Sequence, residues 1–161
     1  MVEIDITLKI NAPFEKVWNI ISNIDNDPFY WKYIVSIKNI TRDRNVVLRE
    51  VYMSNGNKCQ QKITFFPKEG IHIRWTRGAI TGVKDIMLID NGSTTIIRAQ
   101  INYKIGGAVK IGSISVLDEL RSETENALNL IKKDAECKTY HLIKRQPNNI
   151  TKENYFPRDT S

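Results

Sequence analysis

Few side chains in this sequence are of the types that perform acid or base catalysis. The chain contains two histidines, His72 and His141. His72 alternates with Ile71 and Ile73 in an extended pattern, so it faces solvent if the two isoleucines face a core, and geometry decides a general base before its pKa does. His141 follows the last periodic segment, where a solvated imidazole is expected. We therefore expect neither histidine to be catalytic.

The two cysteines, Cys59 and Cys137, form neither a CxxC pair nor a cluster with histidine. This spacing does not support a zinc site or a redox motif, and we expect reduced, structural thiols. No Ser-His-Asp or Cys-His order, glycine-rich phosphate loop or metal-ligand spacing is visible either. We expect no metal and no cofactor.

Four other polar side chains lie in extended segments where they could reach an interior: Arg49, Arg77, Asp85 and Tyr103. Arg49 follows the same alternation as Val47, and Arg77 follows that of Trp75. In an apolar cavity such a group would hold a ligand carboxylate, phosphate or enolate. The alternative is a strand-end or solvent-facing side chain, as is common for Arg and Asp. The weak catalytic candidates are Arg49, Arg77 and Tyr103.

A single long helix is predicted for Ser113–Glu136, and the other elements must cover its apolar stripe. That stripe recurs every three or four residues without an intervening Gly or Pro: Ile114, Leu117, Leu120, Thr124, Leu128, Ile131 and Ala135. At 1.5 Å per residue the helix is about 36 Å long, enough to cross a whole sheet.

The remainder of the chain predicts that sheet. Residues 3–10 alternate apolar and polar, Pro13 suits the first position of a helix over residues 14–21, and a second short helix or turn carries residues 29–31. Period-two segments separated by turn signals such as Asn55-Gly56 and Asn91-Gly92 then predict an antiparallel meander of six strands. These segments are residues 33–40, 45–53, 58–66, 71–77, 82–89 and 94–105.

Composition is that of a globular protein, with 41% hydrophobic and 26% charged residues among 161. Half of the net charge of +6 lies after Cys137, where five Lys or Arg accompany two Asp or Glu. The charge elsewhere is diffuse, so we expect no nucleic-acid binding. No apolar run or leader-like start is visible, which predicts a cytoplasmic protein. We expect one domain over residues 1–137 and a polar, disordered tail over residues 138–161.

The order of the predicted elements, together with several short motifs, resembles that of the SRPBCC superfamily (START, Bet v 1-like, helix-grip) and of its polyketide cyclase/dehydrase-like branch. The resemblance covers residues 1–137 and rests on Ile10-Asn11-Ala12-Pro13 with Glu15, Val17 and Trp18, on Asp25, Pro28 and Trp31, on Gly92-Ser93-Thr94-Thr95, and on Ala127–Glu136. It implies an α+β helix-grip fold: a seven-stranded antiparallel curved sheet wrapped around a long C-terminal helix, with two short helices between strands 1 and 2.

The resemblance also implies a cavity between sheet and helices, typically of roughly 300–1,000 Å³. We expect the protein to bind or carry a hydrophobic small molecule there, such as a lipid, an isoprenoid quinone or a polyketide-like compound. The blander interpretation is that the same positions form a plain core, because core and pocket share one periodicity. The expected ligand-binding residues are Trp31, Ile73, Trp75, Ile97, Ala99, Ile101, Tyr103, Leu117, Leu120 and Thr124.

Two other functions remain open at this point. One is a cyclase or dehydratase in the same cavity, with Arg49, Arg77 or Tyr103 orienting an enolate. The other is an interaction module in which the loop 78–82 and the aromatic residues 29–31 contact a partner or, transiently, a membrane. The sequence identifies neither the ligand nor the oligomeric state.

Overall fold

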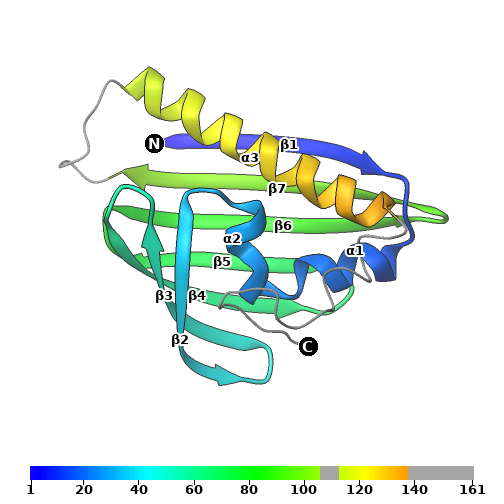
Figure 1. Ribbon diagram of the computed structural model, residues 1–161, viewed down its shortest axis with the longest axis horizontal. Helices are drawn as coiled ribbons and strands as arrows, with labels where there is room; N and C mark the ends of the chain where they lie inside the picture. Colours follow the sequence, from blue (N-terminus) through cyan, green and yellow to red (C-terminus); the bar gives the residue numbers. More distant parts are fainter. Residues whose placement is uncertain (106–112, 138–161) are drawn as a thin grey trace.

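The computed structural model describes residues 1–105 and 113–137 (Figure 1), with the side chains of α3 described from Val116 onward. The elements follow the predicted order: β1 (Val2–Ile10), α1 (Phe14–Ile21), η1 (Ile24–Asn26), α2 (Asp27–Tyr30), β2 (Ile34–Asp43), β3 (Val46–Met53), β4 (Lys58–Phe66), β5 (Gly70–Arg77), β6 (Ile80–Asn91), β7 (Thr94–Ile105) and α3 (Ser113–Glu136). The predicted tail lies outside the described residues.

The seven strands form one antiparallel sheet in the order β1-β7-β6-β5-β4-β3-β2. Strands β2 to β7 are a meander, and β1 closes the order by pairing with β7, as in Ile4 opposite Ile101. The α-helices α1, α2 and α3 lie against the inner face of the curved sheet, and α3 runs across β1 and β7 (Figure 1). The predicted fold class, a sheet gripping a long C-terminal helix, is confirmed.

Buried side chains from the sheet and α3 form the core. Ile97 and Ala99 of β7 are fully buried, and so are Ala127 and Ala135 of α3. The end of α3 is tied to the link between β1 and α1, because the backbone N–H of Asn11 donates to Glu136 Oε2 over 2.7 Å. These contacts fix the helix over one half of the sheet.

The first hairpin differs from its prediction. We expected β2 to end at Ile40, yet it pairs with β3 as far as Asp43, and the turn falls at Arg44 and Asn45. Two register shifts in β2 accommodate the longer pairing. Arg44 takes a φ of +55° there, a conformation that the sequence does not signal because glycine is absent from this turn.

Candidate functional site

Most of the predicted ligand-binding residues lie in the interior between the sheet and the helices. Eight of them are buried: Trp31, Ile73, Trp75, Ile97, Ala99, Ile101, Tyr103 and Thr124. Leu117 and Leu120 of α3 are partly buried against the same core. The side chains that we expected in the interior therefore lie buried or partly buried there, while their contact with a ligand stays a prediction.

A buried ion pair anchors the short helices to the sheet. Arg49 of β3 is fully buried, and its Nη2 donates to Asp27 Oδ2 of α2 over 2.6 Å. The same guanidinium donates from Nη1 to the carbonyl oxygen of Ile24 (2.9 Å) and from Nε to Gln61 Oε1 (2.8 Å). Arg49 thus faces inward, which is one of the two alternatives that the sequence left open, and its charge is already neutralised by a protein carboxylate. An anionic ligand would have to compete with Asp27 for it.

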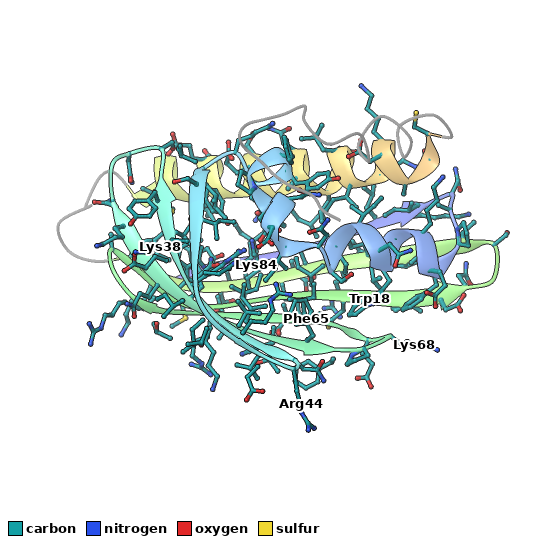
Figure 2. The ribbon with its side chains drawn as sticks, turned by 60° about the horizontal axis from the view of Figure 1, so that its bottom comes forward. Trp18, Lys38, Arg44, Phe65, Lys68 and Lys84 are labelled. Atoms are coloured by element: carbon teal, nitrogen blue, oxygen red, sulfur yellow. The ribbon has the colours of Figure 1, made fainter. Side chains whose placement is uncertain are left out.

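The second buried cation is Lys84 of β6, only 1% exposed. Its Nζ lies 3.3 Å from the centroid of the Trp31 ring and donates to the hydroxyl oxygen of Tyr33 over 3.2 Å. None of the ion pairs among the described residues involves Lys84. Figure 2 shows Lys84 between sheet and helices, whereas Arg44 and Lys68 project outward from hairpin turns.

Burial is the main influence on the charge of this amine. It lowers the pKa of Lys84 to about 7, against an ordinary value of 10.5. The Asp27 carboxylate raises the pKa of Lys84, whereas the Arg49 guanidinium lowers it, as burial does. Near neutral pH, Lys84 is therefore divided between a buried ammonium and a buried amine.

A row of aromatic rings begins beside Lys84, at Trp31 and Tyr33. The ring centroids of Trp31 and Tyr33 are 6.3 Å apart, those of Tyr33 and Trp75 6.2 Å, and those of Trp75 and Tyr103 5.8 Å. Trp75 Nε1 donates to the Tyr103 hydroxyl oxygen over 2.9 Å. Burial raises the pKa of both Tyr33 and Tyr103, so both phenols are neutral at pH 7.

A cavity of about 20 Å³ lies beside this cluster, between α1, α2, α3 and the sheet. It is lined by isoleucines, with Asp27, Tyr30 and Trp31 contributed by α2 and the residue after it. Such a volume holds about one water molecule. This volume lies far below the roughly 300–1,000 Å³ expected of a ligand cavity. Trp31 lines it and also covers Lys84.

Other sequence-based expectations are corrected here. Arg77 is exposed at the end of β5, so it does not enter the interior. Asp85 lies on the outer face of the sheet, where its Oδ1 is 2.6 Å from Nδ1 of the partly buried His72. The expected aromatic surface over residues 29–31 is wrong for Tyr30 and Trp31, which are buried and leave only Phe29 of the three exposed.

Lys84, Tyr33 and Asp27 were not among the predicted site residues. A signal for Lys84 did exist, because it pairs across the sheet with Ile101, which was predicted to face inward. Within residues 1–105 and 113–137, no group of three metal-ligating side chains is found, and no helix is both long and apolar enough to cross a membrane.

Comparison with known proteins identifies the fold. No family model and no curated protein matches this chain, whereas many solved structures do. Zhui aromatase/cyclase from Streptomyces sp. R1128 superposes with a TM-score of 0.67 at 11% identity, over 83% of this chain and 93% of its own. A START superfamily protein from Mycobacterium smegmatis gives 0.65 at 14%, over 83% and 97%.

A third similar structure is that of Ara h 8.0201, a Bet v 1-like protein, with a TM-score of 0.63 at 11% identity over 83% of this chain and 96% of its own. Structural similarity at such low sequence identity establishes the fold and leaves the activity open. The resemblance predicted from the sequence is thereby confirmed at the level of architecture: this chain has the helix-grip fold of the START, aromatase/cyclase and Bet v 1-like proteins.

Proposed function

We propose that this protein binds a small hydrophobic molecule in the interior between its sheet and its helices. The observation that carries this proposal is a set of buried polar atoms that the described residues satisfy only in part. Lys84 lacks an ion-pair partner, and Gln61 Nε2 and Glu123 Oε2 have no hydrogen-bond partner among the described residues. Unsatisfied buried groups destabilise a fold, and those that native proteins retain call for an explanation such as a ligand.

Entry of a ligand larger than water requires the covering segment to move. The 20 Å³ cavity is covered by α1, η1 and α2, and α2 has only four residues. The Arg49 bonds to Ile24 and Asp27 tie this cover to the sheet. We infer that a bound molecule displaces Trp31 and the α2 segment while α3 keeps its place on β1 and β7.

The test is native mass spectrometry of the gently purified full chain, followed by titration with the neutral fluorophore N-phenyl-1-naphthylamine. We expect a defined extra mass that organic extraction removes, and 1:1 uptake of the fluorophore by the extracted protein with a blue-shifted emission. The matched control is an Ala99→Leu variant, since Ala99 is fully buried on the inner face and the larger side chain takes up interior space. A bare mass together with no fluorophore uptake would contradict the proposal.

A cyclase or dehydratase acting in the same interior is the second candidate. The observation that favours it is the Lys84 amine, whose pKa of about 7 suits a general acid or base at neutral pH and which adjoins the Tyr33 phenol. Of the residues predicted for this role, Arg77 is exposed and Arg49 is paired with Asp27, which leaves Tyr103. Deuterium exchange at the acidic carbon of an apolar β-diketone, measured with wild type and Lys84→Met, tests it; equal exchange in both would remove Lys84 from the mechanism.

A further inference from the structure

We propose that the interior site selects an apolar acid, a molecule with a hydrophobic body and one carboxylate or sulfonate, and that Lys84 Nζ is the group that pairs with its anion. This inference rests on the proposed function and adds the chemical class of the ligand. It goes beyond the fold, because it depends on a side chain that no sequence motif marks.

The first step is the balance of charge around Lys84. The charged groups that influence it are Asp27 of α2 and Arg49 of β3. These two are bonded to each other at 2.6 Å, and the effect of Asp27 on the pKa of Lys84 is larger than that of Arg49 but smaller than that of burial. The positive charge of Lys84 is therefore compensated only in part in its buried environment, which is costly unless an anion joins it.

The second step is the set of partners that the ammonium now has. Of its three N–H donors, one reaches the Tyr33 hydroxyl, and the Trp31 ring face lies 3.3 Å from the nitrogen. A ring face attracts a cation more weakly than a carboxylate does when both are desolvated. An anion can therefore replace the Trp31 ring at Lys84.

The third step is the location of the apolar body. Trp31 lies over Lys84 and also lines the isoleucine-walled cavity. When its indole ring moves, the space at Nζ and the cavity join, so an anionic head can reach Lys84 while the hydrophobic part contacts Ile73 and Ile86. One side chain thus separates the polar and apolar halves of the site.

The two tyrosines near Lys84 do not compete with a bound anion for its ammonium group. Burial raises the pKa of Tyr33 and Tyr103, so neither phenol becomes a competing anion at neutral pH. The carboxylate of Glu123 on α3 raises the pKa of Tyr33 further. Pairing with a bound anion raises the pKa of Lys84 above its free value, so binding takes up a proton when the pH is above 7.

The experiment compares two fluorophores with one ring system, neutral N-phenyl-1-naphthylamine and anionic 8-anilinonaphthalene-1-sulfonate. With wild type at pH 6.5 we expect the sulfonate to bind at least tenfold more tightly than the neutral compound. Lys84→Met should abolish that preference and leave binding of the neutral compound within a few fold. Lys62→Met, at an exposed position on β4, is the matched control and should leave both affinities unchanged.

A pH series provides the second readout, because a sulfonate stays anionic throughout. With a free pKa of about 7 for Lys84 and an amine that remains protonated in the complex, affinity for the sulfonate should fall about 50-fold between pH 7 and pH 9. The neutral compound should bind equally at both values. Near-ultraviolet circular dichroism of each variant verifies that the fold is retained.

The outcomes separate the two proposals. If neither fluorophore binds, the interior site itself is refuted. If the neutral compound binds and the sulfonate is not preferred, or if Lys84→Met retains the preference, the apolar-acid inference alone is overturned. Loss of the preference in Lys62→Met as well would assign it to the surface charge and likewise overturn the role of Lys84.

Discussion

Replacing Lys84 by methionine should stabilise the protein, by an amount that depends on pH. Lys84 is 1% exposed and has aromatic neighbours, so an apolar side chain of similar length fits its surroundings without leaving a charge unpaired. The wild-type ammonium is destabilised by burial, and methionine removes that penalty. The variant should therefore have the larger free energy of unfolding at neutral and acidic pH.

The sign and size follow from the pKa of Lys84, which falls from 10.5 to about 7 on folding. Between these values the unfolded chain binds more protons than the folded one, so the stability of the wild type rises with pH from 7 to 10.5 and is lowest below pH 7. The resulting penalty is about 4.5 kcal/mol at pH 6 and about 2 kcal/mol at pH 9. The advantage of Lys84→Met should shrink by about 2.5 kcal/mol over that range.

Urea unfolding of wild type and Lys84→Met at pH 6, 7, 8 and 9 measures this difference. Titrations of the other groups occur in both proteins and cancel in the comparison. Lys62→Met is the control, because Lys62 is exposed on the outer face of β4 and its replacement should give a pH-independent difference close to zero. Parallel stability curves for wild type and Lys84→Met would refute the assignment of a depressed pKa to a buried amine.

Two further predictions concern stability. Arg49→Met should lower the free energy of unfolding by about 3–5 kcal/mol, because Asp27 would remain buried without its partner. In urea unfolding, the double variant Arg49→Met with Asp27→Leu should regain much of that loss. Simple additivity of the two single substitutions would argue against a coupled pair. Gly82→Ala should destabilise strongly in thermal melts, because φ is +125° and an added Cβ would lie 2.2 Å from the carbonyl oxygen of Asn102. Gly56→Ala, where φ is +88° but the surrounding space is open, should cost less, and an equal loss would contradict the steric argument.

The fold could be predicted because its local signals agree with one another. Alternation over residues 94–105 places Ile97, Ala99 and Ile101 on one face, and all three are buried. The uninterrupted stripe over Ser113–Glu136 predicted the bounds of α3. The close packing of the α2 segment was not predictable in this way, because it depends on the distant pair of Arg49 with Asp27.

Lys84 was missed because both faces of β6 carry apolar residues, so alternation alone does not say which face is buried. Val83 and Met87 alternate with Ile86 and Leu88, and the pattern offers either set as the core. The register of the hairpin removes that ambiguity. The two-residue turn at Gly92 and Ser93 sets Asn91 opposite Thr94, and counting back along both strands sets Lys84 opposite Ile101.

Residues directly opposite each other in an antiparallel pair point to the same face. Ile101 belongs to the buried alternation of β7, so Lys84 must enter the interior and Asp85 must leave it, as the structure shows. A lysine that is forced inward by register and forms no ion pair within the described part of the chain is a stronger indication of a ligand site than the apolar positions around it. Apolar side chains satisfy a core equally well without a ligand, whereas a buried, unpaired ammonium does not.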